Sequence, residues 1–341
     1  MVMLTRLLGR TGRTAPALAA ASVLTAVTTF TAMTGGSAAG AAVAASVPRC
    51  NAAKAHQEMA HKLARAIGAA LRARFTSADP SYNPFDDVSV SVSDDSLGLS
   101  CWYGTARKNY SASAVKATIL AALLLKAQDE HRSLDRWEKN EAWLMITQSD
   151  NAAASALWAH VGLTGLQHFL NRAKMKQTVL NTWGAWGLTE ITAHDETLLL
   201  RLLMSPGQVL RTASRQYELD LMNHVISSET WGVRAGSPKY FSWHIKNGWS
   251  PLPDPSSSPW VVNSIGCFIH KTFGYTIVVL TQDNPAPGLS FGIGTIEKIA
   301  WAINRALVPG ARSVWPKSTA TQLSEWALVP DQAPAGPPGG R

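Results

Sequence analysis

The sequence has no pattern typical of a metal site or of a nucleic-acid-binding surface. No two of its three cysteines have the short spacing of a zinc site, and its histidines form no H-E-x-x-H motif. The formal net charge is +8, but Lys and Arg are nowhere clustered with interleaved aromatic residues. We therefore expect no metal, no other cofactor and no nucleic-acid partner.

The first 45 residues differ in composition from the rest of the chain. Arg6, Arg10 and Arg13 precede an apolar stretch from about residue 15 to residue 33, and small residues follow up to Ala45. This order is typical of a secretory signal peptide that is cleaved after Ala45. A transmembrane anchor is the alternative, but the apolar run is short and rich in threonine, so we expect no stable membrane anchor. We expect a secreted protein, extracellular or associated with the cell wall.

All three cysteines lie in the mature chain: Cys50, Cys101 and Cys267. In an exported protein the simplest arrangement is one disulfide and one buried thiol. We expect the disulfide between Cys50 and Cys101, which would tie the N-terminus to a strand, although the sequence alone does not fix the pairing.

The mature chain contains helical and strand-like segments in a simple order. Apolar residues recur at helical spacing in residues 51–75, 111–125, 132–147, 151–162, 163–175, 193–204, 211–225 and 292–307. Strand-like composition marks residues 88–93, 99–104, 239–249, 260–269 and 275–284, the first two being joined by a short turn as a hairpin. The Pro- and Gly-rich tail, residues 331–341, is expected to be disordered.

This order predicts one α+β domain over residues 46–330. Strands from both ends of the domain can form one five-stranded antiparallel sheet. The terminal helices would cover one face of the sheet, and an all-helical insert, about residues 105–235, would cover the other. We expect this domain to be a monomer.

A serine and a lysine stand at the start of the most apolar helix. Ser113 is three residues before Lys116, so the two side chains lie on one helical face. A serine hydroxyl becomes a nucleophile when a nearby base takes its proton, and a lysine with a lowered pKa can be that base. The alternative is a capping serine beside a lysine that extends to solvent.

Two further short motifs follow along the chain. Ser149-Asp150-Asn151 lies between two helices, where it can be a helix cap or a loop that directs Ser149 and Asn151 to a substrate. Lys246-Asn247-Gly248 lies on a predicted strand, where the lysine can be a solvated edge residue. The glycine can instead mark a place where another backbone approaches closely.

Taken together and in this order, the three motifs resemble the signature elements of class A β-lactamases and penicillin-binding proteins. The resemblance extends over about residues 51–308 and implies a β-lactamase/transpeptidase-like fold. It also implies that Ser113 attacks a carbonyl, that Lys116 takes its proton, and that Ser149 relays a proton to the leaving group. Lys246 would hold Ser149 and attract a substrate carboxylate.

The resemblance implies substrate-binding residues as well. Asn151 would hold a substrate amide, and the backbone N–H groups of Ser113 and Trp249 would bind the oxyanion. Asn247 and Gly248 would line the site. Here Asn247 replaces the usual Thr or Ser of the third motif, which puts carboxylate recognition in doubt.

A second departure concerns deacylation. Class A enzymes have a glutamate in the loop after the third insert helix, but here no acid lies between Lys174 and Thr189. Glu190 is the candidate substitute, while Asp195 is better explained as an acid at a helix start.

We therefore expect a serine hydrolase acting on a β-lactam or a related amide or ester, with deacylation that can be slow. The alternatives are a D,D-carboxypeptidase or penicillin-binding protein acting on peptidoglycan peptides, and a pseudoenzyme that binds the cell wall or an antibiotic without turnover.

Overall fold

The computed structural model describes residues 47–75, 87–252, 259–271, 273–285 and 287–313. These residues all belong to one compact unit, Ala44–Arg341. The predicted signal peptide, residues 1–45, and the predicted disordered tail lie outside the described residues.

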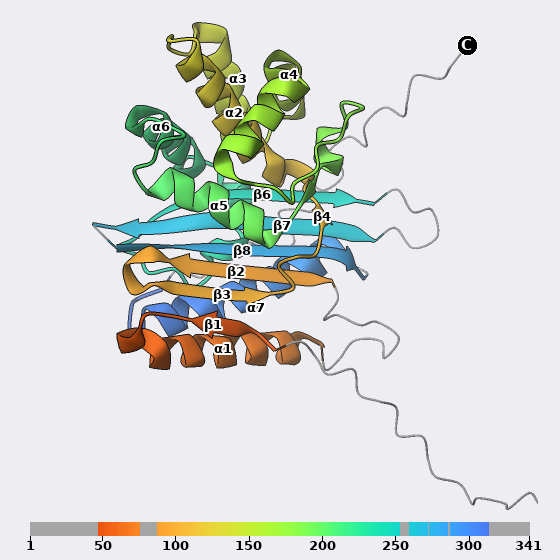
Figure 1. Cartoon of the computed structure of the whole chain (residues 1–341). Coiled ribbons are helices and arrows are strands. Elements are labelled where there is room, and N and C mark those ends of the chain that lie inside the picture. The colour runs from red at the N-terminus through yellow and green to blue at the C-terminus, as the bar shows by residue number, and fades with distance from the viewer. Residues whose placement is uncertain (1–46, 76–86, 253–258, 272, 286, 314–341) are drawn as a thin grey trace, which may run out of the picture. The chain divides into compact units, whose positions relative to one another are not determined.

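One antiparallel sheet with six strands forms the middle layer (Figure 1). Its order is β1-β3-β2-β8-β7-β6. The strands are β1 (Arg49–Asn51), β2 (Val88–Asp94), β3 (Leu99–Tyr103), β6 (Ser242–Pro251), β7 (Trp260–His270) and β8 (Phe273–Asn284). The hairpin and the three C-terminal strands are as predicted.

The strand count of five was wrong because of β1. Its three residues pair with β3, with Cys50 opposite Cys101. A segment this short shows no alternation from which a strand can be recognised. The helix predicted from residue 51 accordingly begins later, as α1 (Gln57–Phe75).

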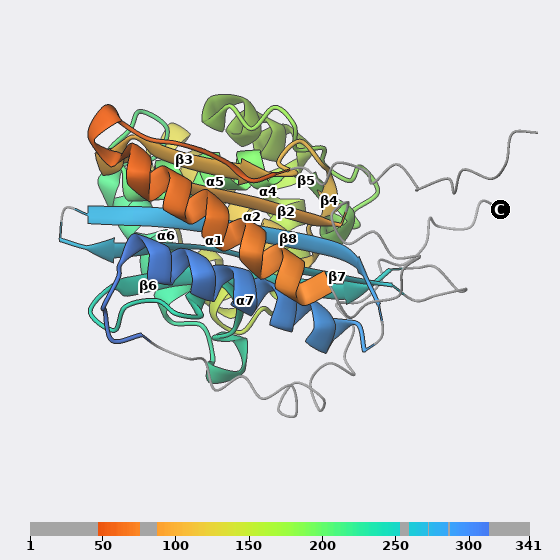
Figure 2. The same ribbon diagram turned by 90° about the horizontal axis from the view of Figure 1, so that it is seen from below.

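Helices cover both faces of the sheet (Figures 1 and 2). On one face lie α1 and α7 (Leu289–Leu307), which contact each other. The other face carries the helical insert: α2 (Val115–Asp129), α3 (Arg136–Thr147), α4 (Asn151–Ala173), α5 (Ala193–Met204) and α6 (Thr212–Asn223). This three-layer α+β arrangement confirms the predicted fold.

Alternating residues of the central strands supply two separate hydrophobic cores. Val278 and Leu280 pack in the core beneath the helical insert, whereas Ile277 and Val279 pack in the core beneath α1 and α7. Successive side chains of a strand point to opposite faces, so a sheet covered on both sides is apolar on both.

Helix boundaries in the insert follow from local chemistry. Thr192 Oγ1 accepts a hydrogen bond from Asp195 N at 3.2 Å, so α5 begins where the capping pattern predicted. Within α4, Gly162 has φ 70° and ψ 161°, which are not helical values. Helix α4 is therefore two helical halves that meet at the predicted break.

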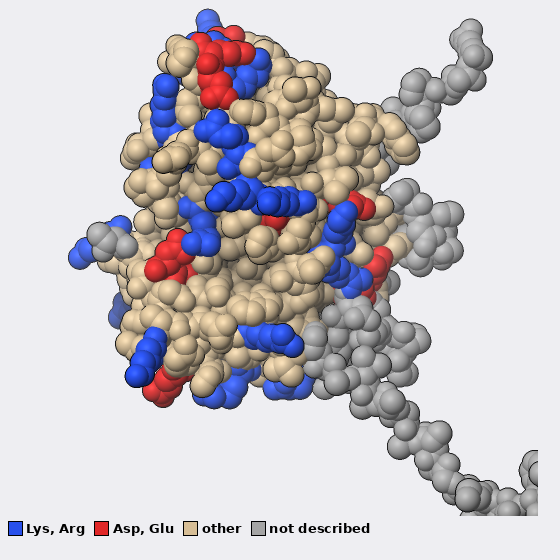
Figure 3. Space-filling view, viewed as in Figure 1, with Lys and Arg blue, Asp and Glu red and all other residues tan. Residues whose placement is uncertain are grey.

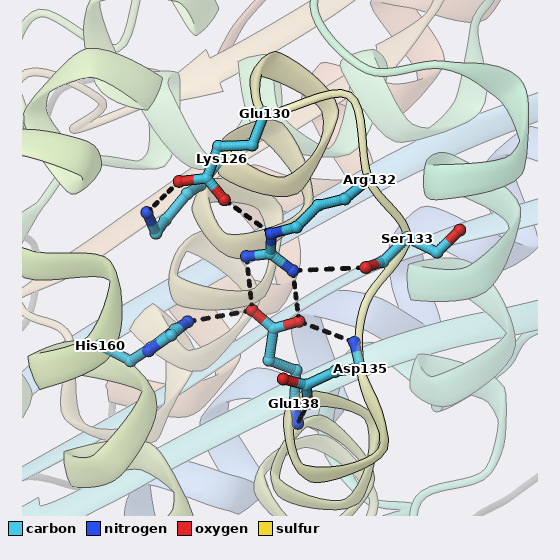
Figure 4. A network of polar contacts seen from close by, with 7 residues as sticks. All are labelled: Lys126, Glu130, Arg132, Ser133, Asp135, Glu138 and His160. Carbon is cyan, nitrogen blue, oxygen red and sulfur yellow. Dashed lines mark hydrogen bonds and ion pairs between the residues drawn. The ribbon is translucent and has the colours of Figure 1, made fainter.

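A buried carboxylate of α3 binds side chains from the α2–α3 loop and from α4 (Figure 4). Glu138 of α3 accepts hydrogen bonds from Arg132 at 2.7 and 2.8 Å and from Asp135 N at 2.8 Å. His160 Nε2 of α4 lies 2.9 Å from the same carboxylate, and Arg132 also binds Glu130 just after α2. Burial alone would raise the pKa of Glu138, but these hydrogen bonds outweigh it and lower the pKa to about 2.

The cysteines are arranged as predicted. Cys50 and Cys101 form a disulfide whose Cα atoms are 4.0 Å apart, and Cys267 is a buried free thiol. No helix among the described residues is both long and apolar enough to span a membrane.

Candidate active site

Ser113 lies in a short 3₁₀ turn, Ala112–Ala114, directly before α2. The preceding Ala112 has φ 44°, a left-handed conformation that is unfavourable for a residue with a Cβ. Such strain persists only where the surrounding structure fixes it, and it is common at functional sites. The neighbouring backbone supplies that restraint: Ser111 N donates to Thr189 O at 2.8 Å, and Ala114 N donates to Ser111 O at 3.1 Å.

Gly248 of strand β6 lies directly against this turn. A Cβ at this position would be 2.5 Å from Ala114 N, 2.7 Å from Ser111 O and 2.8 Å from Ser113 N. No side chain fits at these distances, so glycine is required for β6 to approach the backbone of Ser113. The close approach accounts physically for the glycine of the third motif.

Lys116 is fully buried in the first turn of α2 and faces the second motif. Its Nζ donates to Ser149 O and to Asn151 Oδ1, both at 2.6 Å, and lies 3.3 Å from Ser149 Oγ. The ammonium also lies 4.8 Å from the ring centre of Trp186, a cation–π contact. A lysine of the apolar helix is thus bonded to polar groups of the loop before α4 and of the first residue of α4.

Lys246 approaches the same serine from the sheet. Its Nζ donates to Ser149 Oγ at 2.8 Å, to Asn247 O at 2.9 Å and to Glu229 Oε2 at 3.2 Å. Residues from three distant segments therefore meet around one hydroxyl, with a lysine on either side of Ser149. Ser149 itself has φ 55°, a further strained position at this centre.

The two asparagines of the predicted site have different surroundings. Asn151 is partly exposed at the start of α4, and its side-chain oxygen accepts from Lys116. The amide of Asn247 is buried: it donates to Glu229 O at 2.8 Å and to Trp231 O at 3.2 Å, and its oxygen accepts from Ser264 at 2.6 Å. Binding of substrate by the Asn247 side chain would require one of these bonds to break.

Glu190 forms strand β5 (Glu190–Ile191), which pairs with β4 (Asn109–Tyr110). Its side chain is 39% exposed and bonds to Lys108 at 2.7 Å. The Glu190 carboxylate is thus paired with Lys108 at the surface. The role of Glu190 in deacylation of Ser113 stays a prediction. Trp249 is half-buried and packs edge-on against Trp231, with ring centres 5.8 Å apart.

Asp195 anchors the loop between α4 and α5. Its buried carboxylate accepts from Gln177 N at 2.8 Å and from Thr178 N and Oγ1 at 2.8 and 2.9 Å. Asp195 lies in the first turn of α5, which confirms the prediction of an acid at a helix start. Its side chain also holds the loop at Gln177 and Thr178. The loop that it holds carries Trp186, whose Nε1 donates to Ser155 Oγ at 3.0 Å.

Glu229 is the residue of this centre that sequence reasoning missed. It lies in a short 3₁₀ turn, Ser227–Glu229, and is 4% exposed. No periodicity or motif marks it, because its contact with Lys246 depends on the path of the chain between α6 and β6.

The chain is similar to known proteins in part of its sequence and in its fold. Residues 139–307 match the β-lactamase enzyme family. No curated protein sequence matches the chain significantly. Among solved structures, a β-lactamase from Sphaerobacter thermophilus superposes with a TM-score of 0.57 at 19% identity, covering 72% of this chain and 98% of that one.

Two other similar structures widen the comparison. TLA-3 extended-spectrum β-lactamase has a TM-score of 0.59 at 15% identity, with 70% of this chain and 98% of that chain covered. A protein titled PBP-A has a TM-score of 0.58 at 18% identity, with 71% and 96% covered. At these identities the likeness establishes a shared fold.

Proposed function

Because the chain belongs to the serine β-lactamase and transpeptidase-like superfamily, we propose that it is a secreted serine hydrolase that forms an acyl-enzyme. The substrate class would be a β-lactam or a related amide or ester. The observation that carries the proposal is the Ser149 hydroxyl, which lies 2.8 Å from the Lys246 ammonium and 3.3 Å from that of Lys116.

In this reaction Lys116 first loses its ammonium proton to solvent, and the Ser113 hydroxyl oxygen then bonds to the substrate carbonyl carbon as the hydroxyl proton passes to Lys116 Nζ. The tetrahedral oxyanion is held by the backbone N–H groups of Ser113 and Trp249, each contributing about 3 kcal/mol to the barrier reduction. As the bond to the leaving group breaks, Ser149 gives that group its proton and is reprotonated from Lys116. The product is an ester of Ser113.

Deacylation is expected to be slow. The loop before Glu190 has no acid after Lys174, and it presents the ring of Trp186 to Lys116. An apolar ring does not take a proton from an attacking water. This feature keeps the D,D-carboxypeptidase or penicillin-binding protein as a second candidate, since acylation by a β-lactam that outpaces hydrolysis leaves the β-lactam bound to the serine.

Partners beyond a substrate stay predictions. On the face shown in Figure 3, Lys and Arg side chains are scattered among acidic ones and do not gather in one patch. Among the described residues, no group of three or more His, Cys, Asp or Glu side chains could hold a metal ion.

The test is mass spectrometry of the intact mature chain after incubation with a penicillin, a chromogenic cephalosporin and a neutral activated ester. We expect a covalent adduct that is absent from Ser113→Ala and from Lys116→Ala, and that decays over minutes or longer. Rapid cephalosporin hydrolysis would identify a β-lactamase with efficient deacylation. Absence of any adduct or turnover would refute the serine hydrolase and leave the binding pseudoenzyme.

A further inference from the structure

The lysine of the third motif is already saturated with internal partners. An ammonium has three N–H donors, and Lys246 directs them to Ser149 Oγ, Asn247 O and Glu229 Oε2. The Lys246 side chain is 0% exposed and that of Glu229 is 5% exposed. The positive charge that would attract an anionic substrate therefore has a buried carboxylate beside it.

Glu229 is held in this position by the residue next to Lys246. The Asn247 amide donates to the carbonyl oxygens of Glu229 and Trp231, so strand β6 fixes the 229–231 backbone at two points. Gly232 continues this restraint: its φ is +86°, and a Cβ there would be 2.3 Å from Ser264 Oγ. The position of Glu229 beside Lys246 is therefore fixed by the buried backbone of residues 229–232.

We propose that Glu229 determines substrate specificity by selecting acyl donors that carry no carboxylate next to the reacting carbonyl. This inference rests on the serine hydrolase proposed above and narrows its preferred substrates to those β-lactams, amides or esters that are uncharged next to the reacting carbonyl. A substrate carboxylate within hydrogen-bond reach of Lys246 would lie within about 6 Å of Glu229, where two like charges in a buried site repel strongly.

Strand β7, the neighbour of β6 in the sheet, offers no cation that would offset the repulsion between Glu229 and a substrate carboxylate. Strand β7 contains no arginine or lysine. Arg234, which follows Glu229 in sequence, stacks its guanidinium on Trp243 at 4.2 Å, at the opposite end of β6 from Gly248. Lys246 is thus paired with Glu229, while Lys116, the second lysine of the site, directs its Nζ to Ser149 O and Asn151 Oδ1. This pairing suits an uncharged group beside Lys246.

The test uses two thioester peptides that are identical except for a terminal carboxylate in one and a carboxamide in the other. Acylation of the mature chain is measured as the second-order rate constant for each probe. We expect the wild type to favour the carboxamide by about tenfold or more, since one like charge nearby is removed. Glu229→Gln, which keeps an oxygen for Lys246, should bring the ratio close to one by accelerating the carboxylate probe.

The matched control is Glu130→Gln, which removes a carboxylate that binds Lys126 and Arg132 in the helical insert. It should leave the ratio of the two rates within about twofold of wild type, because distant exposed charges are screened. A wild type that prefers the carboxylate probe would overturn the inference even if Glu229→Gln failed to fold. A folded Glu229→Gln with an unchanged ratio would overturn it as well.

Failure of the proposed function gives a different result. In that case neither probe acylates the wild type, and Ser113→Ala behaves in the same way. Calorimetric binding of the two probes to Ser113→Ala then decides the inference without chemistry. Tighter binding of the carboxamide supports it, and equal or weaker binding of the carboxamide refutes it.

Discussion

Glu196 of α5 is expected to destabilise the folded protein as pH rises. Its side chain is 0% exposed, and neither of its carboxyl oxygens has a hydrogen-bond partner in the described part of the chain. Burial is the larger cause and the charge of Asp195 the smaller one, and together they raise the pKa of Glu196 from 4.5 to about 8. At neutral pH the folded protein therefore keeps Glu196 protonated, whereas the unfolded chain releases that proton.

The size of the effect follows from linkage. Stability from the protonated carboxyl is fully present below pH 4.5 and is lost progressively as pH rises towards 8. At pH 7 the loss is about 3 kcal/mol, from roughly 2.5 pH units at 1.36 kcal/mol each. Glu196→Gln cannot ionise, so its free energy of unfolding should exceed that of wild type increasingly between pH 4.5 and 8.

The assay is denaturant unfolding of the disulfide-intact mature chain across this pH range. Glu58→Gln, at an exposed position in the first turn of α1, is the control and should show a nearly constant difference from wild type. If the difference between Glu196→Gln and wild type is the same at pH 5 and pH 8, the reasoning from burial is refuted.

Three other changes have definite expected outcomes. Gly248→Ala should slow acylation of Ser113 by about 100-fold, measured with a labelled probe, because the new Cβ must displace the backbone of the nucleophile turn. Glu138→Gln should lower the free energy of unfolding at pH 7 by about 2–3 kcal/mol, and the difference should shrink as pH falls from 4.5 towards the folded-state pKa of about 2. Replacing both Cys50 and Cys101 by serine opens a link spanning 51 residues and should cost up to about 4 kcal/mol in chemical denaturation; an unchanged midpoint would contradict this.

Much of the fold could be predicted because its elements carry strong local patterns. The run from Val88 to Ser93 alternates strictly, and the helix over α5 has a capping threonine at Thr192. Strand β1 could not be predicted, since three residues have no period and their pairing with β3 is a tertiary contact. The β4–β5 pair was missed for the same reason, as it joins two dipeptides that are distant in sequence.

The candidate site was predictable only as a set of motifs. Ser113 and Lys116 share a helix turn, so their proximity follows from spacing, but nothing local brings Lys246 to Ser149. That meeting was expected from the family resemblance, and the distances agree with it. Glu190 stays the predicted deacylating residue, and in the structure its carboxylate is bonded to Lys108.

The asparagine of the third motif and the missed glutamate form one feature of the molecule. In the sequence, Asn247 stands where the third motif usually has Thr or Ser, so an amide replaces a hydroxyl that would bind a substrate carboxylate. In the structure its two N–H donors bind two carbonyl oxygens while its own oxygen accepts from Ser264. A serine or threonine hydroxyl has one donor and cannot make both bonds to the 229–231 backbone. The amide is therefore the group that can hold Glu229 beside Lys246. The change of one motif residue to Asn247 thus alters the charge presented to substrate through Glu229, a residue that the motif does not contain.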